Sequence, residues 1–209
     1  LQPPPPIDES IAYFSKQPTW IYRVWLSGSY HLEDQKVKGD FKSSLTGWTP
    51  FQLGTHFQTR RHSIFVIASF KEWKADPVEL PFQSNLTAWE AELSYLYHES
   101  KIWSWGGGVK STTSFEREDF EKIKIKTIIF PTLNAQWSHL DEKWQFKTDF
   151  QFGYMDSTAL AFTRASYQYK VNMDSWNFFV GTKLELTGLF GYQREGYCIE
   201  PALVIGGEW

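Results

Sequence analysis

The sequence predicts an all-β protein, an up-and-down antiparallel β-barrel of about ten strands, and three observations lead to this prediction. Apolar and polar residues alternate with a period of two along most of the chain. Aromatic residues make up 18% of the 209 residues, although the mean hydropathy is only -0.42. No run approaches the roughly 18 to 20 consecutive apolar residues that a membrane-spanning helix requires. A chain of this length suits one all-β domain.

The first half of the chain carries five of the predicted strands. They are expected at residues 19–31, 45–58, 64–70, 89–97 and 103–109. In the first strand the apolar face carries Trp20, Tyr22, Val24, Leu26, Gly28 and Tyr30. Long polar connections are predicted at 33–44 and 71–85, and tight turns at 60–62 and 98–100.

The second half repeats this layout. Its strands are expected at residues 123–137, 144–154, 159–170, 177–187 and 197–209. A long polar connection is predicted at 111–121, and turns are predicted at 138–143 and 172–175. Pro50, Pro131 and Pro201 lie inside predicted strands, where each removes a donor from the hydrogen-bond ladder, so a β-bulge is predicted at each.

The apolar strand faces are predicted to point outward, toward lipid. Aromatic residues gather near the strand ends, where their rings would lie at the headgroup levels of a bilayer. The residues assigned to these two belts are Trp20, Tyr22, Tyr30, Tyr95, Tyr97, Trp144, Tyr154, Tyr167, Tyr169 and Trp209. Long connections alternate with tight turns, which is typical of a transmembrane β-barrel.

The opposite strand faces carry charges in mid-strand, which fits a polar lumen rather than a dense apolar core. The predicted lumen network comprises Arg23, Lys71, Glu90, Glu92, Lys110, Lys147, Asp149, Arg164, Lys183, Glu185 and Glu200. Strand pairing predicts Asp149 near Arg164, Glu90 near Lys71 with Lys110 above it, and Glu200 near Lys183. Such charges are expected to pair, because burial penalises isolated ions. The lumen mouth is predicted to carry Lys122, Lys124 and Lys126.

From Thr19 to Trp209 the chain resembles small bacterial outer-membrane β-barrel proteins. Leu203, Ile205 and Trp209 match the alternating, aromatic-ended final strand that the outer-membrane assembly machinery recognises, whereas Gly207 and Pro201 depart from it. The resemblance implies the outer membrane of a Gram-negative bacterium, with both termini in the periplasm. It also implies contact with outer-membrane lipid and lipopolysaccharide.

Residues 1–18 are predicted to form a separate periplasmic segment below the barrel of residues 19–209. Pro3 to Pro6 make a stiff extended spacer. The residues that follow favour a short helix, which Asp8 can cap. The candidate partner-binding residues of this segment are Ile7, Ile11, Tyr13 and Phe14.

Other partners and cofactors are not expected. The net charge is -3 and the cations are scattered among acids, so the sequence does not favour nucleic acid. Cys198 is the single cysteine, which excludes an internal disulfide and a multi-cysteine metal site. No metal and no cofactor are predicted.

Three functions remain open at this stage. The favoured one is an anchor or subunit of an envelope complex, with a closed lumen filled by charge. The second is a narrow solute channel, in which the mouth lysines would favour anions. The third is a hydrolase. Omptin proteases also have ten strands, and their hydrolysis needs acidic pairs and an Asp–His pair. Here His31 would be the histidine, and Asp34, Asp40 and Asp156 would be the acidic residues. Ser27 and Ser29 would supply the nucleophile of a lipid deacylase.

Overall fold

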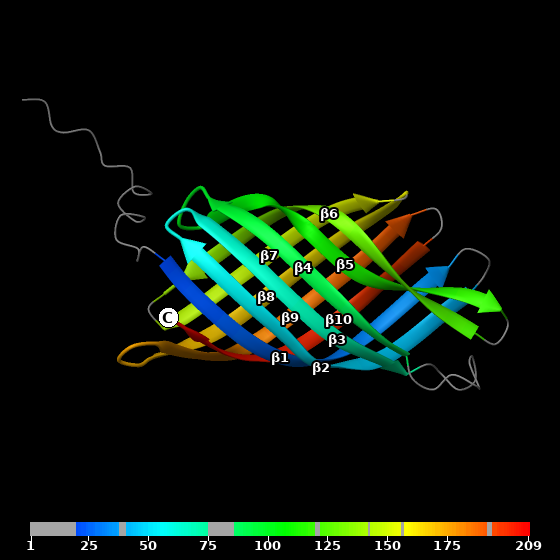
Figure 1. Cartoon of the computed structure of the whole chain (residues 1–209), viewed down its shortest axis with the longest axis horizontal. Helices are drawn as coiled ribbons and strands as arrows, with labels where there is room; N and C mark the ends of the chain where they lie inside the picture. Colours follow the sequence, from blue (N-terminus) through cyan, green and yellow to red (C-terminus); the bar gives the residue numbers. More distant parts are fainter. Residues whose placement is uncertain are drawn as a thin grey trace, which may run out of the picture.

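The computed structural model describes residues 20–37, 41–74, 86–119, 122–141, 143–155, 157–191 and 194–209, and these residues form a closed barrel of ten antiparallel strands (Figure 1). The strands are β1 (Trp20–Val37), β2 (Phe41–Thr59), β3 (His62–Lys74), β4 (Leu86–His98), β5 (Trp103–Asp119), β6 (Lys122–Leu140), β7 (Trp144–Met155), β8 (Thr158–Asn172), β9 (Asn177–Gly191) and β10 (Arg194–Glu208). The predicted N-terminal segment, residues 1–18, lies outside the described residues.

Each strand pairs with its neighbour in sequence, and β1 pairs with β10 to close the barrel. This confirms the predicted fold class and the strand count. In the closing pair, Arg23 lies opposite Glu208 and Gly28 lies opposite Leu203. The end of the barrel that holds Trp209 is called the C-terminal end below, and the other is called the opposite end. No helix in the described part of the chain is long and apolar enough to cross a membrane.

Several strands are longer than the sequence pattern predicts. β1 continues to Val37 and β2 already begins at Phe41, while β5 continues to Asp119 and β6 begins at Lys122. The predicted long connections at 33–44 and 111–121 are therefore wrong. The ladder continues there although most of these residues are polar, and an alternation of apolar and polar residues marks only strands with one apolar face.

β5 and β6 form a ribbon at the opposite end of the barrel. Pairing of β4 with β5 stops at Glu92 and Lys110, and pairing of β6 with β7 starts at Thr132 and Gly153. Beyond these pairs, β5 and β6 pair with each other as far as Asp119 and Lys122. Figure 1 shows this hairpin reaching beyond the barrel wall.

The three strand prolines are accommodated in different ways. At Pro50 the register of β2 against β3 shifts between Trp48 and Phe51, which confirms the predicted bulge. Pro131 lies in regular register opposite Val109, where β6 is paired on one side only, and Pro201 lies in regular register opposite Leu184. The bulges predicted at Pro131 and Pro201 are therefore wrong, because a proline that lacks a ladder partner on one side needs no extra residue.

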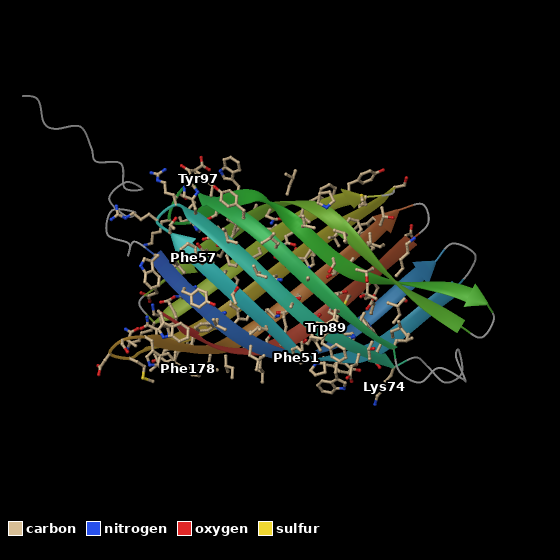
Figure 2. All side chains as sticks on the ribbon, viewed as in Figure 1. Phe51, Phe57, Lys74, Trp89, Tyr97 and Phe178 are labelled. Carbon is tan, nitrogen blue, oxygen red and sulfur yellow. The ribbon has the colours of Figure 1, made fainter. Side chains whose placement is uncertain are left out.

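The outer face of the barrel is apolar and the inner face is polar. Leu133 and Leu203 on the outer face are 73% and 70% exposed, whereas Glu200 on the inner face is 2% exposed. Figure 2 shows Phe57 and Tyr97 toward the C-terminal end of the outer surface, with Phe51 and Trp89 further toward the opposite end. A soluble barrel would have the reverse arrangement, because water would face its polar residues. This surface suits a lipid environment.

Candidate functional site

The candidate site is the barrel interior, and its mid-section is organised around Arg164 on β8. The guanidinium donates from Nε to Glu185 Oε1 at 2.8 Å and from Nη2 to Glu92 Oε2 at 2.9 Å. Glu92 lies on β4, so the second bond crosses the lumen. Asp149 Oδ2 lies 3.7 Å from Arg164 Nη1, so Asp149 and Arg164 lie close together, as the strand pairing predicts.

Further cations and amides complete this mid-section. Lys110 Nζ lies 3.2 Å from Glu92 Oε2 and 3.8 Å from the centre of the Phe162 ring. Lys183 Nζ lies 2.8 Å from Glu185 Oε1 and also donates to Gln52. The three cations Arg164, Lys110 and Lys183 thus balance the three carboxylates Glu92, Asp149 and Glu185. We refer to these six residues as the central network.

A second charged cluster lies beside the central network. Lys71 Nζ lies 3.0 Å from Glu90 Oε2 and 3.0 Å from Glu200 Oε2. Glu200 also accepts a hydrogen bond from Ser29, and Glu90 accepts one from the backbone N–H of Thr113 at 2.7 Å. This cluster links β1, β3, β4, β5 and β10 through side chains.

Two ion pairs join partners other than the predicted neighbours. The ion pair of Glu200 is with Lys71 rather than Lys183, and the ion pair of Lys110 is with Glu92 rather than Glu90. Lys110 lies directly opposite Glu92 in the ladder, whereas Lys71 on β3 reaches Glu200 on β10, a strand with which β3 does not pair. Lysine side chains are long enough to reach diagonally or across the lumen, so partners outside the ladder compete.

Another charged group lies near the C-terminal end. Glu208 forms ion pairs with Arg23 and with Lys170, whose Nζ lies 2.5 Å from Oε1, and accepts a hydrogen bond from Asn177. Lys147 lines a nearby cavity together with Arg23 and His56. Glu208 and Lys170 are not part of the predicted lumen network, although their position on the inward strand face was a signal for them.

A hydrogen-bonded chain of two histidines and two serines lies near the same end. His56 Nε2 is 3.0 Å from Ser63 Oγ, which is 2.5 Å from His98 Nε2, and His98 Nδ1 is 2.6 Å from Ser104 Oγ. All four side chains are buried. This hydrogen-bonded chain was not predicted, because His98 was assigned to a tight turn.

Apolar side chains fill the interior at the opposite end. Leu45, Trp73 and Leu86 form one buried cluster, against which Ile125 packs. Ile128, Phe130, Leu160 and Leu189 form the other. These clusters lie beyond the charged residues, so the interior is not uniformly polar as the alternation predicts.

His31, the candidate catalytic residue, lies within this apolar end. Its ring is fully buried and packs edge-on against Trp73, with ring centres 5.4 Å apart. Thr49 Oγ1 lies 3.4 Å from Nδ1, while Nε2 has no hydrogen-bond partner among the described residues. Of the predicted acidic partners, Asp40 and Asp156 lie outside the described residues. The structure thus places His31 under a tryptophan and away from solvent.

The predicted mouth lysines are only partly described. Lys122 and Lys124 lie on β6 opposite Asp119 and Glu116, but the described side chains do not include theirs. Lys126 is exposed, and its neighbour Ile125 packs inward against the Trp73 cluster.

The spaces between the interior side chains are small. Two cavities of about 10 Å³ each border Glu92 and Arg164, and one of about 60 Å³ lies between His56 and Lys147. A cavity needs roughly 10 to 15 Å³ to hold one water molecule. These spaces accommodate single waters or small water groups. Within the described residues, no group of three or more His, Cys, Asp or Glu residues could hold a metal ion.

The predicted belt aromatics lie on the outer surface. Trp20, Tyr22, Tyr95, Trp144, Tyr154, Tyr167 and Trp209 are exposed, and Tyr30, Tyr97 and Tyr169 are half-buried. Trp144 stacks on Tyr167 with ring centres 4.9 Å apart. Further exposed tryptophans that the prediction left out are Trp48, Trp89, Trp103 and Trp105.

Comparison with known proteins bears on the fold alone. Neither a protein-family model nor a curated protein sequence matches the chain. Among solved structures, it is similar to the outer membrane protease OmpT from Escherichia coli, with 9% identity and a TM-score of 0.49 over 91% of this chain and 96% of that chain.

The chain is also similar to Ail, the attachment invasion locus protein of Yersinia pestis, with 9% identity and a TM-score of 0.39 over 90% of this chain and 98% of that chain. For the translocator domain of the autotransporter NalP from Neisseria meningitidis, the identity is 8% and the TM-score is 0.38 over 95% of this chain and 91% of that chain. No activity is carried over at such identities. The closed barrel, its apolar outer face and its polar interior are the features of a transmembrane β-barrel.

Proposed function

We propose that this outer-membrane β-barrel is a closed anchor for an envelope complex rather than a channel or an enzyme. The observation that carries the proposal is the bond from Arg164 to Glu92, which crosses the lumen inside a charge-balanced network. A conducting pore needs an open path along its axis. The central network and the apolar clusters at the opposite end both occupy that path.

The size of the barrel supports the same conclusion. Small transmembrane barrels have an interior just wide enough for side chains to fill, whereas barrels of 16 to 18 strands leave an aqueous channel. Ten strands belong near the filled end of this range. Cavities of about 10 to 60 Å³ between the charged side chains agree with a filled interior.

The anchor role rests on what the barrel displays outside itself. Beyond Lys110 and Thr132, the β5–β6 ribbon is paired only within itself among the described residues, so its strands present backbone groups that another chain can pair with. Residues 1–18, with Ile7, Ile11, Tyr13 and Phe14, are proposed as a second contact, on the periplasmic side.

The proposed setting is the Gram-negative outer membrane, with both chain ends in the periplasm. An even number of strands brings β1 and β10 back to the same side. Leu203, Ile205 and Trp209 are exposed on the outer face of the last strand, where the assembly machinery would meet them. Lipid and lipopolysaccharide would surround the remaining apolar face.

Current recording across a planar bilayer tests the closed lumen. The purified, folded protein is expected to give no stepwise current. The double variant Arg164→Ala with Glu92→Ala removes the bridge across the lumen but leaves the apolar clusters at the opposite end in place, so it too is expected to give no stepwise current. Regular unit steps from the unmodified protein would contradict the proposal and favour a channel.

Two further experiments test the remaining parts. Deleting residues 1–17 should reduce the recovery of cross-linked partners from intact cells, and unchanged complexes would remove this segment from the anchor role.

The variant His31→Ala should leave lipid and peptide hydrolysis at background. A hydrolytic rate in the unmodified protein that this variant abolishes would restore the enzyme.

A further inference from the structure

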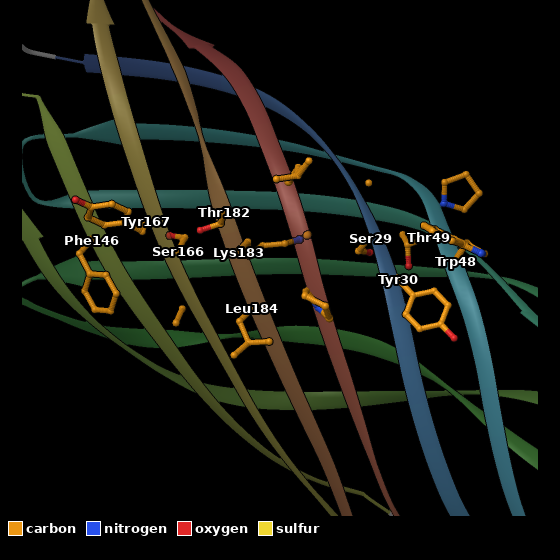
Figure 3. A pocket seen from close by; sticks show the side chains of 16 residues that line it. Ser29, Tyr30, Trp48, Thr49, Phe146, Ser166, Tyr167, Thr182, Lys183 and Leu184 are labelled. Carbon is orange, nitrogen blue, oxygen red and sulfur yellow. The ribbon is translucent and has the colours of Figure 1, made fainter.

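A broad hollow lies on the outer, lipid-facing surface of the barrel. It has a volume of about 840 Å³ and extends over six neighbouring strands, β7, β8, β9, β10, β1 and β2 (Figure 3). Small-molecule sites in proteins measure about 300 to 1,000 Å³. The hollow is therefore large enough to hold a ligand on a surface that is otherwise exposed to lipid.

The outward-facing residues that line the hollow lie in two rows across the strands. Between these rows lies an inward-facing row that also belongs to the lining, Ser166, Lys183, Ala202, Ser29 and Thr49. In one outward-facing row the ladder joins Phe146 to Tyr167, Tyr167 to Thr182, Thr182 to Leu203, and Leu203 to Gly28. The other outward-facing row joins Ala165 to Leu184 and Leu184 to Pro201, and continues at Tyr30 and Trp48. Figure 3 shows Phe146 and Tyr167 at one end, and Tyr30 and Trp48 at the other.

The middle of the hollow combines small side chains with Leu184, Pro201 and Leu203. Gly28, Ala165 and Thr182 lie between the aromatic ends. A Cβ added to Gly28 would lie 3.4 Å from the nearest atom, the carbonyl oxygen of Pro50, which is an ordinary contact. For comparison, a Cβ at Gly106 would lie 2.0 Å from the carbonyl oxygen of Tyr95. The backbone does not require a glycine at position 28, and the missing side chain leaves space on the lipid side.

Strand pairing is interrupted beside Pro50 and Pro201, in the part of the wall under the hollow. The β1–β10 ladder pairs Ser29 with Ala202 and next Leu32 with Ile199, so the positions of Tyr30 and Pro201 are skipped. The register of β1 against β2 shifts between Ser27 and Ser29, beside Pro50. The strand surface is irregular here, and both prolines line the hollow.

We propose that this hollow is a binding site for one membrane lipid, held by its acyl chains. The hollow opens onto the apolar outer face, so its occupant must be soluble in hydrocarbon. Flexible acyl chains can follow an irregular trough between Leu184 and Leu203. A second barrel is convex and would meet the aromatic side chains at both ends before it reached the floor at Gly28. The proposal needs only that the barrel lies in a bilayer, and does not depend on the anchor role.

The polar atoms at the two ends suit the rest of such a lipid. Tyr30 and Tyr167 carry phenolic hydroxyls and Trp48 an indole N–H, groups that prefer the boundary between hydrocarbon and headgroups. They can donate to the ester oxygens that join acyl chains to a headgroup. The site would thus hold the chains in the hollow and the ester region at an aromatic end.

Photo-cross-linking tests the proposal. The full chain is reconstituted into vesicles of phosphatidylethanolamine and phosphatidylglycerol that contain a phosphatidylethanolamine with a diazirine on its acyl chain. Labelled peptides are then identified by mass spectrometry. Label is expected to concentrate on peptides of the hollow, above its level on the apolar face of β4 to β6.

Two variants fill the hollow from different strands. Gly28→Leu and Ala165→Phe should each reduce labelling of the hollow by about fourfold. This is the change in affinity expected if the bound lipid loses the burial of about one acyl methylene group. The matched control is Ala135→Phe, on the outer face of β6 and outside the hollow, which should leave the labelling unchanged. Heat-modifiable migration shows whether each variant has folded. A loss of labelling can then be distinguished from a failure of the barrel to assemble.

The outcomes decide between the occupants. A fall with both filling variants, and not with Ala135→Phe, supports a lipid site. Labelling that is uniform over the apolar face, or that both filling variants leave unchanged, overturns it. Cross-linking of the hollow to a second protein chain, in place of lipid, overturns it in favour of a docking surface.

Discussion

Replacing Arg164 with methionine removes the cation that joins three carboxylates in the central network. The two bonds at 2.8 and 2.9 Å are hydrogen bonds between charged groups, and both ends are buried. Hydrogen bonds to charged groups contribute about 1.5 to 3 kcal/mol each, which sets a range of about 3 to 6 kcal/mol.

The cations that remain after the substitution reduce its expected free-energy cost. Lys110 still lies 3.2 Å from Glu92, and Lys183 still lies 2.8 Å from Glu185. Asp149 keeps the hydrogen bond from Gln136 at 2.5 Å and loses its nearest cation. Breaking a buried ion pair by removing one partner costs about 3 to 5 kcal/mol. We therefore expect Arg164→Met to lower the free energy of unfolding by about 3 to 4 kcal/mol.

The assay is equilibrium unfolding in urea with the protein in lipid vesicles, followed by tryptophan fluorescence. Arg60→Met, at an exposed position in the turn after β2, is the control and should change the free energy by no more than about 0.5 kcal/mol. Adding Asp149→Asn to Arg164→Met should recover part of the loss, because it removes the carboxylate left without its cation. A loss below about 1 kcal/mol for Arg164→Met would mean that water screens the lumen charges, and the reasoning for a filled interior would fail.

Three further variants test the interior and the wall. Phe130→Ala, in the fully buried apolar cluster, should lower the free energy of unfolding by about 3 to 5 kcal/mol in the same urea assay, while Leu133→Ala on the lipid face should cost far less. Gly106→Ala should prevent assembly of the heat-modifiable barrel, because its Cβ would lie 2.0 Å from a backbone oxygen, whereas Gly107→Ala, at 3.2 Å, should assemble. Ser63→Ala removes the hydroxyl between two buried histidines and should cost about 1 to 3 kcal/mol by urea unfolding; an unchanged midpoint would show that water replaces it.

The local pattern was sufficient for the strand count and for the facing of most side chains. Alternation of residues places Leu203 outside and Glu200 inside, since successive side chains of a strand point to opposite faces. Pairing between consecutive strands then brings Asp149 opposite Arg164. Both inferences depend on short sequence distances, which the hairpin turns fix.

The same reasoning failed where partners are distant in sequence. Glu92 and Arg164 are 72 residues apart and meet across the lumen, and Lys71 reaches Glu200 on β10. Such contacts depend on the diameter of the barrel and on side-chain length. The alternation of side chains along each strand places Ser63 and His98 on the inner surface, but it does not show that they are in contact.

The hollow on the outer surface was also beyond the sequence pattern. The pairing of β1 with β2 brings Gly28 beside Pro50, but only the closing pair of β1 with β10 brings Pro201 to the same region of the wall. The register that joins Gly28 to Leu203 sets the shape of this region.

The sequence by itself determined a barrel of ten antiparallel strands, with an apolar face for lipid and charges within. Alternation and turns are local properties, and they follow from backbone geometry whatever the distant parts of the chain do. The tertiary structure alone decided how the charges pair, where apolar side chains fill the interior and where the wall is hollowed. Closure of the barrel sets these features, because it fixes the distances between residues on opposite walls.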